Sequence, residues 1–310
     1  MAKKRPWQVD YLVYLVVRVI ICLVQMLTWY RALQLAEFLG WLLHRVDRRH
    51  RQVAAENIRH AFPDMNDEAI ARLVHDTYQH WAHVVIEMIR MPRTLRPNTY
   101  ERYYYYPEPD QERRALWLSR NALPSMLVSG HFGNFEALSY ILGLHETTGS
   151  IIARRLDNPY LDAFLQRFRQ STGQQILDKN LDYERILDEL RQGGRLGMVG
   201  DQDAGPRGVF VDFLGRPAST FKSIALLCIE FQAPMLVMGA ARVGKPMRFA
   251  LYLEDVIYPH EYAHRPDAVA AITQRYTNAL ERMVRRHPEQ YFWLHRRWKH
   301  QPKARAKKAA

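Results

Sequence analysis

The chain has 310 residues, which is enough for one large domain or two small ones. Hydrophobic residues make up 48% and aromatic residues 12%, so the chain can bury a sizeable core, which argues against intrinsic disorder as its main state. The 44 Lys and Arg residues outnumber the 32 Asp and Glu residues, and the net charge of +12 indicates an anionic partner: nucleic acid, a membrane surface or an acidic substrate. Both cysteines, Cys22 and Cys228, lie in apolar runs rather than at a metal or redox spacing, which fits a reducing, cytosol-facing environment.

The chain begins with the basic sequence MAKKR, and an apolar run at residues 11–27 follows. A helix over this run would be about 25 Å long at 1.5 Å per residue, near the lower limit for crossing a bilayer. Arg18 lies in its middle, where a charge is unfavourable in hydrocarbon. A second apolar stretch at residues 33–43 ends in a basic cluster. We therefore expect residues 1–45 to form a membrane anchor with interfacial helices, which either spans the bilayer or lies in its interface. A buried helix of a soluble protein is the alternative.

Residues 52–90 have apolar positions at helical spacing, and beyond Pro92 predicted strands alternate with predicted helices. We expect a strand at the four tyrosines of residues 103–106 and a Gly/Pro-rich loop at residues 204–220. The other predicted strands are residues 124–130, 149–155, 174–177, 195–203, 233–243 and 247–256, and the predicted helices are residues 135–144, 159–170, 181–194, 221–231 and 266–287. This alternation predicts an α/β fold with a mixed, mostly parallel sheet flanked by helices. We expect one catalytic domain at residues 46–300 and a solvated basic tail at residues 301–310.

The stretch SGHFGNFE, residues 129–136, lies where a buried strand is predicted to turn into a helix. Ligands of open α/β sheets bind outside the carboxyl ends of the strands, so His131 stands where a ligand would bind. With His131 in the turn and Glu136 in the first helical turn, the two side chains can meet. An ionised Glu136, favoured near a helix N-terminus, would then orient the imidazole, and His131 could act as a general base. A pair with this spacing also occurs by chance.

Two further predicted strands end in charged residues. Arg154 and Arg155 follow the residues SIIA, and Asp201 follows LGMVG. Three strands therefore deliver charged side chains to one edge of the sheet. No HExxH pattern or cysteine run predicts a metal site, and the GxSxG and Walker patterns of hydrolases and nucleotide-binding proteins do not occur.

Several separated blocks, in order along the chain, carry a resemblance to a known family. They are AAENIRHAFP, GHFGNFEAL, ARRLDNPYLDAFLQRFR, GDQDAGPRGVFVDFLGRPAST and PEQYFWLHRRWK, together with the N-terminal apolar run. The sequence resembles the lipid A biosynthesis (lauroyl/myristoyl) acyltransferases, a family that includes phosphatidylinositol-mannoside acyltransferases. The resemblance implies a glycerolipid-acyltransferase-like fold. Many members read Tyr-Arg-Pro where this chain has Ala153-Arg154-Arg155, which leaves the acceptor and the acyl length open.

The resemblance implies transfer of a fatty acyl chain from acyl-carrier protein or acyl-CoA to a hydroxyl of a membrane glycolipid. His131 would be the general base and Glu136 its partner, without a metal or any cofactor besides the donor. Arg154, Arg169 and Asp201 match further family positions, where the arginines would bind phosphate or stabilise negative charge. Alternatively the arginines form ion pairs with Asp201 or Asp157. The expected location is the inner (cytoplasmic) membrane, at an anionic surface, with the catalytic domain facing the cytoplasm.

Three other functions remain open at this point. A phosphatidylinositol-mannoside or other lysophospholipid acyltransferase would use the same residues on another acceptor. A lipid hydrolase would use His131 and Glu136 to activate water and would release free fatty acid. A non-catalytic basic protein would bind membranes or nucleic acid through charge alone, but the sequence has no recognised nucleic-acid motif, so we expect no nucleic acid among the partners.

Overall fold

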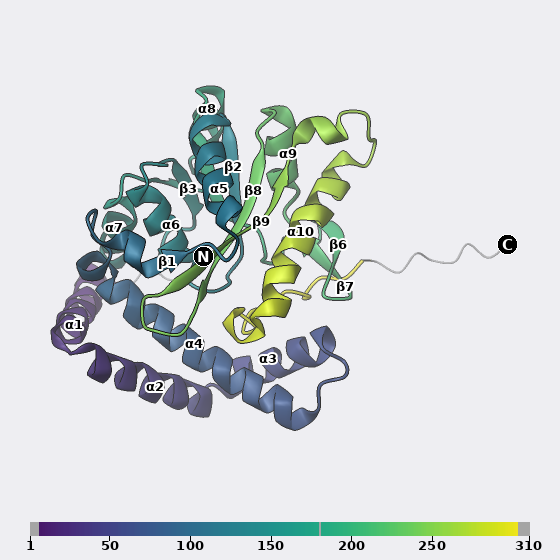
Figure 1. The fold of residues 1–310 in the computed structure, drawn as a ribbon. Helices are drawn as coiled ribbons and strands as arrows, with labels where there is room; N and C mark the ends of the chain where they lie inside the picture. The colour runs from purple at the N-terminus through teal and green to yellow at the C-terminus, as the bar shows by residue number, and fades with distance from the viewer. Residues whose placement is uncertain (1–5, 180, 303–310) are drawn as a thin grey trace.

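The structure is a computed structural model that describes residues 6–179 and 181–302, without the side chain of Pro109. Most of the predicted basic tail, residues 303–310, lies outside this described part. The chain begins with a group of helices and continues into an α/β domain, and the two pack against each other (Figure 1).

The N-terminal part consists of the helices α1 (Trp7–Met26), α2 (Trp29–Val46), α3 (Arg48–Ala61) and α4 (Asp67–Thr94). Small residues of α2, such as Ala32 and Ala36, pack against Ala82 and Ile86 of α4 and so let the two helices approach closely. Among the described residues, α1 is the one helix long and apolar enough to cross a membrane, and its 20 residues would extend about 30 Å. The predicted N-terminal helix is therefore present.

The α/β domain is built on a seven-stranded sheet, counted over the described residues, with the order β1-β9-β8-β2-β5-β3-β4. The β8–β9 pair is antiparallel and the other pairs are parallel, which confirms the predicted mixed, mostly parallel sheet. In chain order the strands of this sheet are β1 (Tyr104–Tyr105), β2 (Ser125–Ser129), β3 (Ser150–Ala153), β4 (Gln175–Asp178), β5 (Arg195–Val199), β8 (Met235–Arg242) and β9 (Phe249–Ile257).

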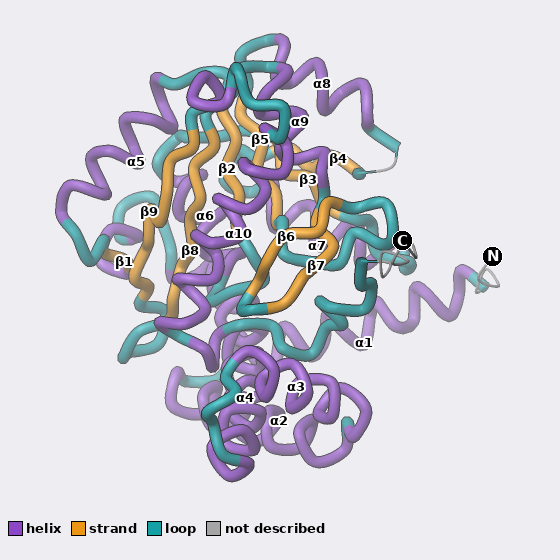
Figure 2. The backbone as a smooth tube through the Cα atoms, turned by 90° about the vertical axis from the view of Figure 1, so that its right-hand side faces the viewer, coloured by secondary structure: helices purple, strands orange, loops and turns teal. Residues whose placement is uncertain are grey.

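Helices cover both faces of the sheet (Figure 2). They are α5 (Pro109–Asn121), α6 (Phe135–Leu144), α7 (Pro159–Gln170), α8 (Tyr183–Arg191), α9 (Lys222–Glu230) and α10 (Ala268–Arg286). Helices α5, α6 and α7 pack on one face in a cluster that includes Leu138, Phe168 and Leu236. Helices α8, α9 and α10 pack on the other, around Met126 and Val128 of β2. This burial on both faces explains why β2 has apolar side chains on both of its sides.

The connections change direction next to β5. The chain moves along the sheet from β2 to β3 and β4, and then returns to β5 and β8. Because parallel crossovers are right-handed, the helices that follow β3 and β5 lie on opposite faces, and a crevice forms between the carboxyl ends of these neighbouring strands. The β3–β5 pairing covers only Ser150 with Leu196 and Ile151 with Gly197, so the strand ends diverge beyond it.

Two sequence-based predictions need correction. The predicted loop at residues 204–220 contains an antiparallel hairpin of β6 (Val209–Phe213) and β7 (Arg216–Thr220). Its turn places Leu214 and Gly215 at positive φ, 55° and 80°, and the buried Leu214 is held by a hydrogen bond from its N–H to Glu281. Of the four tyrosines at 103–106, only Tyr104 and Tyr105 form a strand, because the residues before them form a 3-10 turn.

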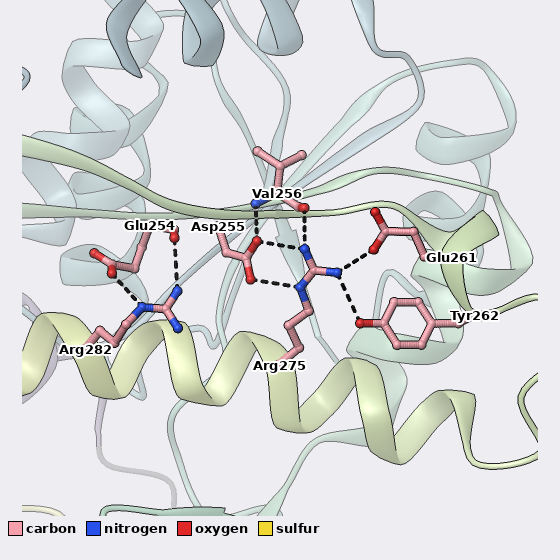
Figure 3. A network of polar contacts seen from close by, with 7 residues as sticks. All are labelled: Glu254, Asp255, Val256, Glu261, Tyr262, Arg275 and Arg282. Carbon is pink, nitrogen blue, oxygen red and sulfur yellow. Dashed lines mark hydrogen bonds and ion pairs between the residues drawn. The ribbon is translucent and has the colours of Figure 1, made fainter. Parts of the chain in front are cut away.

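Ion pairs and hydrogen bonds hold the long helix α10 against β9 (Figure 3). Arg275 donates from Nε to Asp255 at 2.9 Å and from Nη2 to the carbonyl of Val256 at 3.0 Å, and it also reaches Glu261 and Tyr262. Two turns further on, Arg282 binds Glu254 at 2.8 Å. A bidentate guanidinium–carboxylate pair fixes orientation as well as distance, so α10 keeps one register on the sheet.

Candidate active site

The turn that carries His131 is fixed by contacts from two separate parts of the chain, strand β8 and the segment after α10. Gly133 has a φ of 56°, and a Cβ there would lie 1.9 Å from the carbonyl oxygen of Ala240. The N–H of Gly133 donates to the carbonyl of Gln290 at 2.9 Å, and the N–H of Asn134 donates to that of Ala240 at 2.8 Å. The N–H of Phe292 donates to the carbonyl of His131 at 3.0 Å. Only glycine fits at position 133, and the turn has little freedom to move.

A buried polar network from α4 supports the same turn. The side chain of Asn134 caps α6 by accepting from the N–H of Ala137 and donates to Glu87 at 3.0 Å. Glu87 also accepts from Nε of Arg242 at 2.9 Å and is only 2% exposed. An unpaired carboxylate would be costly at this depth, so these hydrogen bonds stabilise both the charge and the position of the turn.

His131 and Asp201 form the central pair of the site. Nδ1 of His131 lies 2.8 Å from one carboxylate oxygen of Asp201, and the backbone N–H of His131 donates to the other, also at 2.8 Å. Asp201 is almost fully buried, with 1% of its side chain exposed, and His131 is 19% exposed. With Nδ1–H bonded to Asp201, the other ring nitrogen, Nε2, is left unprotonated in the neutral imidazole. This is the arrangement of a general base with an orienting acid.

The pKa values of the pair agree with this arrangement. Burial lowers the pKa of His131, but the carboxylate of Asp201 and the more distant charge of Glu136 raise it more, so the net pKa lies above its ordinary value. Burial raises the pKa of Asp201, but His131 and His295 outweigh this effect and hold it well below its usual range. Asp201 is therefore ionised at any physiological pH, and it stabilises the protonated imidazole that forms when His131 accepts a proton.

Contrary to the expectation from the sequence, the structure does not bring the carboxylate of Glu136 into contact with His131. The carboxylate of Glu136 is turned toward α7, where it forms a bidentate ion pair with Nε and Nη2 of Arg169. Both side chains are largely buried, with 6% and 17% exposed. No hydrogen bond joins Glu136 to His131 in the described part of the chain, and Asp201 is the carboxylate that bonds Nδ1 of the imidazole. Glu136 acts on His131 through its charge alone.

The remaining predicted site residues lie around this pair. Arg154 follows β3, is exposed, and pairs with Asp157 at 3.0 Å. This is one of the ion pairs expected from the sequence as the alternative to phosphate binding. Sequence reasoning missed Gln202, although it stands beside Asp201: its side-chain nitrogen lies 3.4 Å from Nε2 of His131. Within residues 6–179 and 181–302, no group of three or more side chains has the arrangement of a metal site.

A cavity of about 620 Å³ opens at the crevice between β3 and β5. His131, Glu136, Arg154, Arg169 and Gln202 line it at the carboxyl edge of the sheet. Away from this edge the wall is mostly apolar and is contributed from both faces of the sheet, for example by Leu138 and Leu142 of α6, Ile151 of β3, and Ile186, Ile224 and Leu227 of α8 and α9. Polar side chains such as Ser125, Ser150 and Arg195 interrupt it. A catalytic pair at the entrance and an apolar interior suit a substrate with a polar reacting group and a long hydrocarbon tail.

The segment after α10 completes the site. Phe292 lies against the His131 ring, with 6.1 Å between ring centroids, and its N–H bonds the carbonyl of His131. His295 places Nε2 at 3.3 Å from the carbonyl of Asp201 and is half-buried. Asn57 of α3 holds the segment by donating to the carbonyls of Trp293 and His295. No local pattern in the sequence assigns these residues to the site; their membership in one of the resemblance blocks is the only signal.

Comparison with known proteins identifies the family. Residues 2–300 match the sequence profile of the bacterial lipid A biosynthesis acyltransferases. The chain belongs to this family. It is therefore an acyltransferase, as the sequence blocks predicted.

Individual relatives are distant in sequence but similar in length. The chain is 24% identical over 273 residues to a lipid A biosynthesis acyltransferase of Haemophilus influenzae, covering 85% of this chain and 82% of that protein. It is 23% identical over 276 residues to the lipid A biosynthesis lauroyltransferase of Escherichia coli, covering 85% and 84%. A phosphatidylinositol mannoside acyltransferase of Mycobacterium tuberculosis is 26% identical over 180 residues, covering 57% and 55%. These relatives differ in acceptor, so the family fixes the reaction class and not the substrate.

Proposed function

We propose that this protein transfers a fatty acyl chain from a thioester donor, acyl-carrier protein or acyl-CoA, to a hydroxyl of a membrane glycolipid related to the lipid A precursors. The observation that carries the proposal is the His131–Asp201 pair at the entrance of an apolar cavity. The hydrocarbon chain of the donor would occupy the interior, which places the thioester carbonyl at the entrance beside Nε2 of His131. The names of the relatives support a lipid acceptor.

In the proposed reaction, Nε2 of His131 takes the proton of the acceptor hydroxyl as its oxygen attacks the thioester carbonyl. The side-chain amide of Gln202, 3.4 Å from Nε2, donates to the oxyanion that develops on the carbonyl. The tetrahedral intermediate then collapses, the carbon–sulfur bond breaks, and His131 returns the proton to the leaving thiolate. One thioester and one hydroxyl give one ester and one thiol, so the reaction balances without a metal or an additional cofactor.

The two arginines and Glu136 have different roles in this proposal. Arg169 and Glu136 hold α7 against α6 and so keep the cavity wall in place beside His131. Arg154 lies exposed at the entrance, where its guanidinium would bind a phosphate of the donor or of the acceptor. Its pairing with Asp157, which is even more exposed, contributes little free energy, so a phosphate can displace Asp157.

The proposed location is the inner (cytoplasmic) membrane, with the catalytic domain in the cytoplasm, where thioester donors are made. The apolar helix α1 and the net charge of +12 support a place at an anionic membrane surface. The alternative acceptor is a phosphatidylinositol mannoside or another lysophospholipid, which would use the same site. The 26% identity to a mycobacterial mannoside acyltransferase keeps this alternative open.

The test is mass spectrometry of lipids from cells that lack the protein and are complemented with either the wild-type chain or the His131→Ala variant. We expect one lipid class to gain an acyl chain with the wild-type protein and not with the variant. Asp203→Asn is the matched control, because this neighbouring acid binds His300 and not His131. An identical lipid profile with His131→Ala, or an increase only in free fatty acid, would contradict the proposal, and the latter would indicate a lipid hydrolase.

A further inference from the structure

Helix α1 has an outer face that is apolar over its whole length. Six side chains at a spacing of three or four residues are 44–62% exposed: Val9, Leu12, Val16, Val19, Ile20 and Leu23. Exposure of this many large apolar side chains on one helix is unusual on the surface of a soluble protein and indicates a site of interaction with a membrane or a protein.

The inner face of the same helix carries most of its polar side chains, although Gln8 is exposed. Arg18 turns inward, where its guanidinium stacks 4.8 Å from the ring of Phe164 in α7 and bonds the hydroxyl of Tyr14 at 3.0 Å. Asp10 is 9% exposed, and its carbonyl accepts from Asn158 at 2.8 Å. The helix is therefore amphipathic, with its polar side against the protein. A helix that spans a bilayer alone would expose these groups to hydrocarbon, where a charged side chain is costly.

Both halves of α1 are attached to the body of the protein. The first half packs on α7, where the rings of Tyr11 and Tyr160 are 5.2 Å apart. The second half packs on α4, where Gln25 donates to the carbonyl of Ile89 at 3.0 Å and Arg90 donates to those of Val24 and Leu27. The helix cannot cross a bilayer as a separate anchor without losing these contacts.

The surroundings of the apolar face fit anionic lipid. Arg31, Arg93 and Arg96 are exposed next to the C-terminal end of α1, and none takes part in an ion pair among residues 6–179 and 181–302. Helix α2 adds exposed Phe38 and Trp41, which are stacked with 6.0 Å between centroids. Helices α1 and α2 follow each other at the lower left of Figure 1. Aromatic and cationic side chains around an apolar surface are typical of the headgroup region of a membrane.

We propose that α1 does not cross the bilayer but lies along its surface, with the outer face in the acyl-chain region of an anionic leaflet and the inner face on α7 and α4. This arrangement would place the cavity next to the membrane surface, because α7 carries both the contacts to α1 and the cavity residues Leu165 and Arg169. A lipid acceptor in the same leaflet would then meet the cavity without leaving the membrane. The mode of docking does not depend on the chemistry at His131.

Fluorescence quenching measures the depth of α1 directly. In the full-length protein with Cys22→Ser, single cysteines are introduced as Val9→Cys, Val16→Cys and Leu23→Cys and labelled with an environment-sensitive fluorophore. Cys228 stays unlabelled, because it is fully buried and burial raises the pKa of its thiol to about 12. The protein is bound to vesicles of phosphatidylethanolamine and phosphatidylglycerol that contain nitroxide-labelled lipids, with the nitroxide at a shallow or a deep position.

We expect the three positions to have the same shallow depth. A spanning helix would instead place position 16 deepest and positions 9 and 23 near the two surfaces, and this result would overturn the proposal. Absence of lipid quenching at all three positions would overturn it as well. The neighbouring residues Ile20 and Ile21 form a matched pair, because Ile20 is 50% exposed on the outer face and Ile21 is half-buried against the protein. We expect lipid to quench a label at 20 severalfold more than one at 21, whereas a separate spanning helix would give equal quenching.

A vesicle-binding assay supplies an independent readout. The triple substitution Leu12→Ser, Val16→Ser and Leu23→Ser should lower the partition of the protein onto these vesicles at least tenfold. The control substitutes three other exposed apolar residues outside α1 and α2, Trp117, Leu123 and Leu226, with Ser and should leave the partition unchanged. Wild-type partition of the α1 triple variant would overturn the proposal. Performing the assay also with His131→Ala separates docking from catalysis, because that variant should dock like the wild type even if the proposed reaction is wrong.

Discussion

The His131–Asp201 contact makes a specific prediction for Asp201→Asn. One oxygen of Asp201 accepts from the backbone N–H of His131 and the other accepts from Nδ1–H, both at 2.8 Å. An asparagine has one acceptor oxygen, and the backbone N–H can only donate, so this oxygen will face the backbone. The amide NH2 will then face Nδ1 and donate to it, which moves the imidazole proton to Nε2. A ring protonated at Nε2 cannot take a proton from the acceptor hydroxyl.

The expected loss can be bounded from these contacts. Loss of a general base costs about 10²–10⁴-fold in rate, and conversion of the orienting acid of a catalytic histidine into an amide has an effect near the upper end of this range. This corresponds to about 3–5 kcal/mol of transition-state stabilisation at 1.36 kcal/mol per tenfold change. The assay is transfer of a radiolabelled acyl chain from acyl-carrier protein to extracted membrane lipid by the purified protein, with kcat and KM measured separately. We expect the loss in kcat, with KM nearly unchanged.

Two control variants make this result interpretable. Asp203→Asn changes the adjacent acid, which binds His300 at 2.7 Å, and should retain most of the activity. Glu136→Gln weakens the pair with Arg169 without altering the tautomer of His131, so it should lower kcat less than Asp201→Asn does. Full kcat in Asp201→Asn together with a 100-fold loss in Glu136→Gln would refute the reasoning and would return the orienting role to Glu136.

Three further predictions follow from the site. Because Asp201 raises the pKa of His131, kcat/KM of the wild type should fall as the pH drops through that raised pKa. In Asp201→Asn the residual activity should fall at a lower pH than in the wild type. A fall at the same pH in both proteins would show that another group titrates. Arg169→Met leaves the carboxylate of Glu136 buried without its partner and should lower the free energy of unfolding by about 3–5 kcal/mol in denaturant titrations, whereas the double variant with Glu136→Leu should recover most of this loss. Gly197 lines the cavity, and a Cβ there would lie 3.6 Å from Ile151, so Gly197→Leu should fold but should reduce transfer of long acyl chains more than of short ones in a donor-length series; equal reduction at all lengths would place the hydrocarbon elsewhere.

The strand–turn–helix unit around His131 could be predicted because its signals are local. The residues from 124 to 130 are apolar on both faces of a strand, and the following ten residues have a cap and an apolar helix pattern; the structure has β2 and α6 at these places. The alternation of strands and helices predicted the sheet in the same way. The turn of the β6–β7 hairpin escaped prediction because Leu214 adopts a positive φ, which a leucine rarely does, and long-range burial and the contact to Glu281 stabilise it.

The identity of the carboxylate beside His131 could not be predicted, because it depends on the register of two strands far apart in the sequence. The β2–β5 pairing sets Ser129 opposite Val199, so the residues two positions beyond each, His131 and Asp201, meet at the strand ends. Glu136 is close in sequence but belongs to α6, and its side chain is directed toward α7 on one face of the sheet. Local spacing favoured Glu136, and tertiary structure favours Asp201.

The most direct test of the proposed function is a single-turnover reaction of purified protein with a radiolabelled acyl thioester and extracted inner-membrane lipid. The proposal predicts that the label appears as an ester on a lipid that carries a free hydroxyl, with one thiol released for each acyl chain transferred, and that His131→Ala and Asp201→Asn lower this rate by at least 100-fold. Appearance of the label as free fatty acid at the same rate with and without lipid acceptor, or transfer at the wild-type rate by His131→Ala, would contradict it.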